Sequence, residues 1–350
     1  MEITDLLMAT HKNKASDLHL STGNPPVMRV HGDMLPLDMP VLTAEQIRKM
    51  IYSIMTEHQR ADYERDYELD FSVSFNEDMR FRVNAFNTIY GPAAVFRTIP
   101  TRILSLETLG APQVLKRLCH LHKGMILVTG PTGSGKSTTL AAMVDYINQN
   151  FNKHILTVED PVEFIHTPRR SLINQREVGG STRSFAKALK SALREDPDVI
   201  LVGELRDLET IQLAMTAAET GHLVISTLHT NDAKSTIERI LDIFPADAKA
   251  QVRIQLASSL VAVVSQNLLL RADGSGRTPA CEVLVRSPTI ENLIMKKELE
   301  KIPAAMANSN KYYHMQTMNQ DLERLVGLGH VTAEEALKTS NNPEDLRLRL

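Results

Sequence analysis

Gly130-Pro-Thr-Gly-Ser-Gly-Lys-Ser137 is the stretch of this 350-residue chain that decides its fold. It matches the P-loop pattern G-x-x-x-x-G-K-[ST] at every required position. An apolar segment, Met125–Val128, precedes it, and a helix-forming segment, residues 138–147, follows it. Glycines allow backbone N–H groups to surround a phosphate, and the following helix N-terminus adds its positive dipole end. The sequence therefore predicts a nucleotide-binding α/β domain.

The loop and the first turn of its helix are expected to bind ATP and Mg²⁺. Lys136 is expected to reach the β- and γ-phosphates, and the Ser137 hydroxyl to bind Mg²⁺. A chance glycine-rich turn would rarely lie between a strand and a helix. The predicted nucleotide-binding residues are Gly130, Pro131, Thr132, Gly133, Ser134, Gly135, Lys136, Ser137 and Thr138.

Short apolar runs on both sides of the P-loop predict a parallel sheet that is buried on both faces. Besides residues 125–128, these runs are Ile155–Val158, Val199–Val202 and Leu223–Leu228. Helical patterns lie between them. One has apolar residues at positions i, i+4, i+7 and i+8, which are Phe185, Leu189, Ala192 and Leu193. Alternation of strands and helices is typical of a doubly wound α/β domain.

Changes of pattern along the chain predict its domain organisation. Residues 1–99 are interpreted as a small α+β domain, and residues 100–112, with a proline at each end, as a linker. Residues 113–287 are expected to form the ATPase domain, and residues 288–350 a helical C-terminal region. In the first domain the pattern predicts helices at 4–11 and 43–63, a turn at 87–92, and strands at 16–20, 27–31, 79–86 and 93–99.

Two arginines of the first domain are expected to face each other. If the hairpin formed by residues 79–99 is centred between Ile89 and Tyr90, Arg82 lies directly opposite Arg97. Like charges that face each other across a strand pair destabilise it, so an anion between them is one interpretation. Two solvated arginines that splay apart are the alternative.

Acidic residues follow two of the predicted parallel strands, at the edge where open α/β sheets bind ligands. Glu204 follows one strand, and after the strand that ends at Val158 come Glu159, Asp160 and Glu163. Hydrolysis needs a group that orients the attacking water and carboxylates that hold water bound to the metal. Glu204 is predicted to act on the attacking water, and Glu204 and Glu163 to hold Mg²⁺ through water. Surface acids that cap loops are the alternative interpretation.

His229 follows a further strand, in Ser226-Thr-Leu-His-Thr-Asn231. Its position at the same predicted edge favours a contact with the γ-phosphate or the attacking water. A structural histidine is the alternative interpretation.

Composition argues against several classes of protein. The formal net charge of −3 gives no electrostatic case for nucleic-acid binding. Two cysteines, Cys119 and Cys281, cannot form a four-thiolate zinc site and are expected to be buried and reduced. Polar residues interrupt the most apolar stretch, residues 256–270, and the N-terminus lacks the features of a signal peptide. A cytoplasmic protein without a transmembrane segment is expected.

Four motifs, in this order and spacing, resemble the secretion ATPase superfamily of type II secretion and type IV pilus systems. The family is named by a Walker A loop, an Asp box, a Walker B segment and a His box, which correspond to residues 130–137, 157–164, 198–204 and 227–229. The similarity extends over most of the chain. Further matching stretches are Ser16–Leu20, Arg80–Phe86, Asn174–Val178, Ala192–Pro197 and Ala218–His222.

The resemblance implies a homohexamer whose subunits have a PAS-like N-terminal domain and a RecA-like C-terminal domain. It also implies that Arg82 and Arg97 reach the phosphates of the nucleotide. Arg239 matches a segment near subunit contacts and is a candidate for a phosphate contact in trans, although a helix-surface arginine is the alternative.

Within the superfamily the resemblance is to pilus retraction ATPases, because the chain begins with the PAS-like segment and lacks a four-cysteine motif. The implied partner is an inner-membrane pilus platform protein, on which a cytoplasmic ring would dock peripherally. Two segments depart from the usual pattern: Thr289–Lys296 replaces Ala-Ile-Arg-Asn-Leu-Ile-Arg-Glu, and His314-Met-Gln-Thr317 replaces Gly-Met-Gln-Thr. The tail, residues 344–350, resembles that of the accessory retraction paralogue, which is the alternative role and a possible partner. A RecA-type nucleic-acid motor is the alternative of another class.

Overall fold

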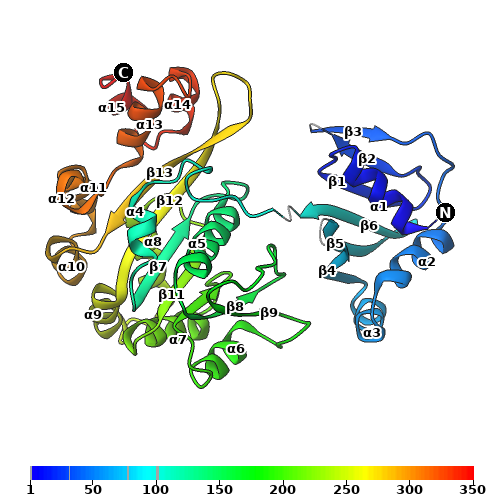
Figure 1. Cartoon of the computed structure of the whole chain (residues 1–350), viewed down its shortest axis with the longest axis horizontal. Coiled ribbons are helices and arrows are strands. Elements are labelled where there is room, and N and C mark those ends of the chain that lie inside the picture. Colours follow the sequence, from blue (N-terminus) through cyan, green and yellow to red (C-terminus); the bar gives the residue numbers. More distant parts are fainter. Residues whose placement is uncertain (1, 31, 77–78, 100–101) are drawn as a thin grey trace. The chain divides into compact units, whose positions relative to one another are not determined.

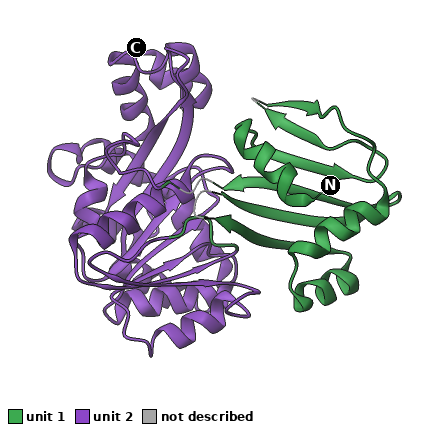
Figure 2. Ribbon diagram, turned by 45° about the vertical axis from the view of Figure 1, so that its right-hand side comes forward, with its two compact units in different colours: residues 1–102, 161–165 green, residues 103–160, 166–350 purple. Residues whose placement is uncertain are grey.

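The computed structural model describes residues 2–30, 32–76, 79–99 and 102–350 of the chain (Figure 1). The chain divides into two compact units (Figure 2). The first contains residues 1–102 and 161–165, and the second contains residues 103–160 and 166–350. Pro100 and Thr101 of the expected linker lie outside the described residues, and Leu106 is buried in the core of the second unit.

The first unit contains an antiparallel sheet in the order β3-β2-β1-β6-β5-β4. Its strands are β1 (Asp17–Ser21), β2 (Val27–Val30), β3 (Asp33–Pro36), β4 (Glu68–Asn76), β5 (Met79–Thr88) and β6 (Gly91–Ile99). The predicted hairpin is present, with a shorter turn at Ile89 and Tyr90, and His31 of the predicted strand 27–31 lies outside the described residues. β3 and β4 were not predicted, because β3 is exposed throughout and β4 has an irregular burial pattern.

One face of this sheet carries the core of the unit. Alternate residues of the strands, among them Leu18, Val83 and Phe96, pack against α1 (Ile3–Lys12) and α2 (Ala44–Ile54). The single helix predicted over residues 43–63 is wrong, because the chain forms α2 and a separate α3 (Glu57–Asp66). Thr56 begins α3 with a capping box to Gln59, which ends the preceding helical segment.

The second unit is built on a seven-stranded sheet in the order β13-β12-β7-β11-β10-β8-β9. The strands are β7 (Gly124–Thr129), β8 (His154–Glu159), β9 (Leu172–Glu177), β10 (Val199–Val202), β11 (Leu223–Leu228), β12 (Leu260–Leu270) and β13 (Arg277–Val285). β13 pairs antiparallel with β12, and the other neighbouring strands are parallel. The four strands expected from apolar runs are confirmed, whereas β9, β12 and β13 were not predicted.

Helices cover both faces of this sheet, as a doubly wound domain requires. Ile126 and Val128 of β7 belong to a core with α4 (Val114–Leu118) and α5 (Lys136–Asn150). Met125 and Leu127 point to the opposite core. That core includes α6 (Phe185–Ala192), α7 (Leu208–Glu219), α8 (Ala233–Ile243) and α9 (Lys249–Ser259).

The C-terminal region is helical, as expected. It consists of α10 (Pro288–Met295), η1 (Leu299–Lys301), α11 (Ile302–Ala307), α12 (Asn310–Tyr313), α13 (Met318–Gly327), α14 (Ala333–Thr339) and α15 (Pro343–Arg347). The last three helices pack around Leu269 of β12 and Ala280 of β13 (Figure 1). In the part of the chain that the structure describes, no helix combines the length and the hydrophobicity of a membrane span.

Candidate nucleotide-binding and hydrolysis site

The P-loop leaves the end of β7 and enters α5 at Lys136. Gly130, Gly133 and Gly135 have φ angles of +140°, +80° and +89°, a backbone region that favours glycine. A Cβ at Gly130 would also lie 2.2 Å from the carbonyl oxygen of Gln266. The glycines are therefore required both by the curvature of the loop and by its contact with β12.

Two side chains of the loop fit a phosphate ligand. Lys136 is buried, and its Nζ donates hydrogen bonds of 2.9 Å to the carbonyl oxygens of Gly130 and Pro131. The Ser134 hydroxyl is buried and has no hydrogen-bond partner among the described residues. A buried polar group without a partner is rare, and a bound phosphate would supply one. Ser137, the expected Mg²⁺ ligand, lies in the first turn of α5 beside Lys136.

Gln266 is a residue of this site that the sequence analysis did not identify. Its Nε2 donates a 2.6 Å hydrogen bond to the Ser134 carbonyl, and its Oε1 accepts a 2.8 Å bond from the Thr139 hydroxyl. Gln266 is buried on β12, so it holds both the loop and the first helical turn in place. Its polar side chain inside the apolar stretch 256–270 was the signal that could have revealed it.

The predicted catalytic residues Glu204 and His229 lie together. His229 directly follows β11, and Glu204 follows β10 after the single residue Gly203. Glu204 Oε1 lies 3.4 Å from His229 Nε2. Glu204 Oε2 accepts a 2.8 Å hydrogen bond from Arg206 Nε and forms a 2.7 Å ion pair with Arg206 Nη2. The Glu204 carboxylate raises the pKa of Arg206, a neighbour that sequence reasoning also missed.

Glu159, the last residue of β8, lies close to the end of β10. Glu159 Oε1 accepts a 2.8 Å hydrogen bond from the Thr157 hydroxyl and a 3.4 Å bond from Gln175. A Cβ at Gly203 would lie 3.3 Å from the Cα of Glu159, so glycine allows β8 and the end of β10 to approach closely. Asp160 is exposed and also raises the pKa of Arg206. Glu163 belongs to the first unit.

The predicted register of the arginine hairpin is confirmed, because Arg82 pairs with Arg97. Both belong to the face of the sheet opposite its core. An acidic residue lies beside each arginine. Arg97 Nε donates a 2.9 Å hydrogen bond to Oδ1 of buried Asp17. Arg82 Nε lies 3.9 Å from Asp70 Oδ1. The like charges are therefore balanced within the unit. Arg239 is exposed on α8.

Comparisons with known proteins give the family of the chain. A family model described as Type II/IV secretion system protein matches residues 2–275. The chain is 50% identical over 345 residues to the type IV pilus retraction ATPase PilT of Pseudomonas aeruginosa, with 99% of this chain and 100% of that protein covered. It is 41% identical over 350 residues to the type IV pilus ATPase PilU of the same organism, covering 100% of this chain and 91% of that protein.

A crystal structure of the pilus retraction motor PilT with bound ADP has the same fold. The TM-score is 0.92 at 46% sequence identity, and 99% of each chain is covered. This agreement confirms the predicted RecA-like α/β domain and its helical C-terminal region. The chain therefore belongs to the type II/IV secretion system protein family, within which it is an ATPase of the pilus-retraction group.

Proposed function

We propose that the chain is the subunit of a homohexameric motor that hydrolyses ATP to retract and disassemble type IV pili, which produces twitching motility. One observation carries the proposal. The P-loop follows β7, His229 follows β11 and Glu204 follows β10, and these three strands are parallel neighbours in one sheet. A triphosphate on the P-loop would face a carboxylate from the same edge, as hydrolysis requires.

Different residues bind the nucleotide, act on the attacking water and contact the γ-phosphate. Residues 130–138 bind the nucleotide, and Lys136 leaves its two loop carbonyls to contact the phosphates. Glu204 exchanges Arg206 for the attacking water, which it orients or deprotonates. His229, 3.4 Å from that carboxylate, contacts the γ-phosphate side.

Mg²⁺ is the expected metal of this site. Ser137 would bind it directly, while Glu204 and Glu163 would hold its water ligands, with Glu159 and Asp160 as further candidates. The hydroxyl and carboxylate oxygens available are ligands that Mg²⁺ prefers. When bound, the metal would neutralise charge on the β- and γ-phosphates.

Three arginines are proposed to contact the phosphates of the nucleotide. Arg82 and Arg97 contact the γ-phosphate, and Arg97 must exchange Asp17 for it. Loss of the γ-phosphate after hydrolysis returns Arg97 to Asp17, which makes the contact a two-state switch. Arg239 would contact phosphate from a neighbouring subunit.

The proposed partner is an inner-membrane pilus platform protein, with the hexamer docked on it from the cytoplasm. A paralogous retraction ATPase is a second proposed partner. Conformational changes of the subunits, repeated around the ring, would move the platform protein and so withdraw pilin subunits. This step rests on the resemblance to pilus retraction ATPases.

Phosphate release by the purified protein tests the proposal. Steady turnover of Mg-ATP is expected, and Lys136→Ala should abolish nucleotide binding because it removes the positive charge that contacts the phosphates. A strain in which the gene for this protein is deleted should recover twitching when it carries the wild-type gene. It should remain non-motile when it carries the Lys136→Ala gene. Absence of ATP turnover under every assembly condition would refute the motor.

Two alternatives predict other results. An accessory retraction ATPase would hydrolyse ATP weakly alone, and its deletion would leave twitching partly intact. A nucleic-acid motor would be stimulated by DNA or RNA, with a steep salt dependence. The formal net charge of −3 argues against the second alternative.

A further inference from the structure

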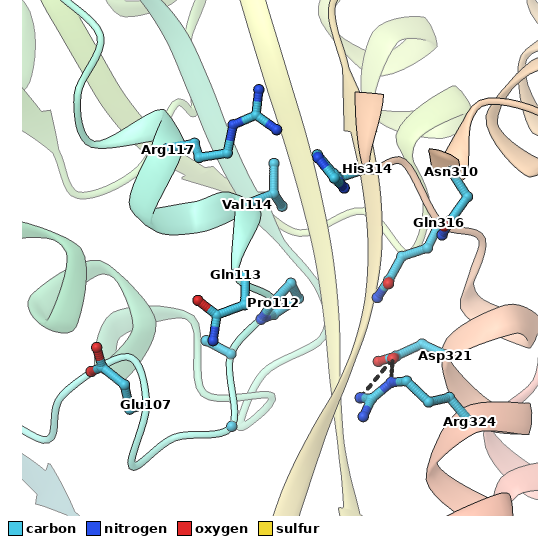
Figure 3. A pocket seen from close by; sticks show the side chains of 12 residues that line it. Glu107, Pro112, Gln113, Val114, Arg117, Asn310, His314, Gln316, Asp321 and Arg324 are labelled. Carbon is cyan, nitrogen blue, oxygen red and sulfur yellow. Dashed lines mark hydrogen bonds and ion pairs between the residues drawn. The ribbon is translucent and has the colours of Figure 1, made fainter. Parts of the chain in front are cut away.

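A cavity of about 550 Å³ opens in the second unit, away from the residues assigned to hydrolysis. Residues of α4 and the segment before it form one wall, and residues of α12, α13 and the segment between them form the other (Figure 3). This volume is within the range of small-molecule sites, roughly 300–1,000 Å³. The cavity includes His314, which follows α12.

The acidic side chains of the cavity already have cationic partners. Asp321 is buried; it forms a 2.8 Å ion pair with Arg324 and accepts a 2.8 Å hydrogen bond from the Cys281 backbone N–H. Glu107 forms an ion pair with Lys116, and this contact lowers the pKa of Glu107 to about 2. Both carboxylates are therefore neutralised by neighbouring cations.

Two basic side chains remain available on opposite walls. Arg117 projects from α4, and His314 lies across the cavity from it (Figure 3). Both are exposed, and neither side chain makes a hydrogen bond or ion pair with another residue that the structure describes. A guanidinium offers a planar set of donors that matches phosphate and carboxylate oxygens. These donors favour an anionic ligand.

The backbone at His314 is unfavourable for a side chain. His314 ends α12 with φ 55° and ψ 32°, the left-handed conformation that glycine adopts at least cost. This chain carries an imidazole there, in the lining of the cavity. A residue held in a strained conformation at a cavity is a reason to look for a ligand.

The remaining residues that line the cavity indicate the chemical nature of the ligand. Ala111, Pro112 and Val114 contribute apolar surface on the same wall as the amide of Gln113, and the amide of Asn310 lies on the opposite wall (Figure 3). Apolar walls with a few polar groups are typical of sites that bind small organic molecules. We propose that this cavity binds a small phosphate monoester, with the phosphate between Arg117 and His314 and the organic group against Ala111, Pro112 and Val114.

Calorimetric titration of the full-length protein with phenyl phosphate tests the site. The protein is first saturated with Mg-ADP, so that the P-loop is occupied. One phenyl phosphate per subunit is expected to bind, and Arg117→Ala should weaken the binding at least tenfold because a charge-assisted contact is lost. Arg347→Ala, which removes an exposed arginine of α15 that does not line the cavity, should leave binding unchanged.

A second variant separates binding from folding. His314→Gly should weaken binding several-fold while the thermal unfolding midpoint stays the same or rises, because glycine relieves the left-handed backbone. Inorganic phosphate should bind more weakly than phenyl phosphate, since it cannot use the apolar wall. Equal binding of the two probes would show a simple phosphate site and refute the monoester.

Other results would overturn the site altogether. These are no binding of phenyl phosphate, or equal affinities in Arg117→Ala and Arg347→Ala. These titrations measure binding of phenyl phosphate and not ATP turnover, so their failure is distinguishable from failure of the proposed motor.

Discussion

The Glu204 carboxylate contacts two neighbours: Oε1 lies 3.4 Å from His229 Nε2, and Oε2 accepts a hydrogen bond from Arg206 Nε. Glu204 and His229 come from the ends of two adjacent parallel strands, so the sheet itself brings them together. The arrangement places a carboxylate and an imidazole at the edge of the sheet where the P-loop also begins. Predictions about catalysis therefore start from this pair.

Glu204→Gln should reduce ATP turnover by about 10²–10⁴-fold, because an amide cannot accept a proton from the attacking water. ATP binding should persist, since the P-loop is unchanged. Phosphate release and titration with a fluorescent ATP analogue measure the two effects. Glu209→Gln, a surface glutamate paired with Lys190, should behave as wild type. Equal turnover in the two variants would contradict the role of Glu204.

Gln266→Ala should weaken nucleotide binding about tenfold by releasing Ser134 and the first turn of α5. It should also lower the free energy of unfolding by about 1–3 kcal/mol, because a buried carbonyl and a buried hydroxyl lose their partner. Chemical denaturation and nucleotide titration check both effects. The matched control is Gln149→Ala, whose exposed amide contacts Asp145 within one helix. A variant with normal nucleotide affinity would show that the loop needs no support from β12.

Glu282 should make stability depend on pH. It is a carboxyl of β13 that accepts hydrogen bonds from the backbone N–H groups of Ala233 and Met318, the first residues of α8 and α13. Burial, together with the nearby Asp232, raises the pKa of Glu282 to about 7, although the two N–H groups oppose this. The folded protein thus holds a proton that the unfolded chain releases near pH 4.5.

Stability should consequently fall as the pH rises from about 4.5 to 7, by on the order of 3 kcal/mol from this group. Glu282→Gln should remove this part of the pH dependence while keeping an acceptor for Ala233. Urea denaturation at pH 5, 6, 7 and 8 measures the change, with the exposed Glu300→Gln as control. If the free energy of unfolding changed with pH in the same way for Glu282→Gln and wild type, the prediction would be contradicted.

Asp17→Asn should destabilise the first unit at neutral pH. Burial alone would raise the pKa of Asp17, but hydrogen bonds from Arg97 and Ser16 outweigh it, so the pKa is lowered. A carboxyl with a lowered pKa stabilises the fold above its unfolded value of 3.8, and this contribution is lost as the pH falls through the lower, folded value.

The expected loss at pH 7 is about 1–2 kcal/mol, since Arg97 is itself largely exposed. The difference from wild type should shrink below pH 3.8. Denaturation of both proteins at pH 7 and pH 3 measures it. Asp66→Asn, which removes an exposed partner of Arg65, should have no effect at either pH. A difference that is constant with pH would exclude the Asp17 charge as its cause.

Local patterns in the sequence predicted much of the scaffold. The P-loop pattern and the four apolar runs located β7, β8, β10 and β11, because strands buried on both faces are apolar throughout. The hairpin register followed from alternation and turn position, since a slip of one residue would turn every side chain to the other face. That register alone predicted the pairing of Arg82 with Arg97.

Tertiary structure decided which side chains support the site. Gln266 contacts the P-loop from 132 residues away, and Asp17 contacts Arg97 from 80 residues away. Such contacts depend on how the strands are ordered in a sheet. Local periodicity in the sequence does not predict that order. The sequence by itself therefore determined four of the parallel strands, the arginine hairpin, the phosphate loop and the acids that follow two of these strands. Only the assembled sheet determined which partners hold those groups in place.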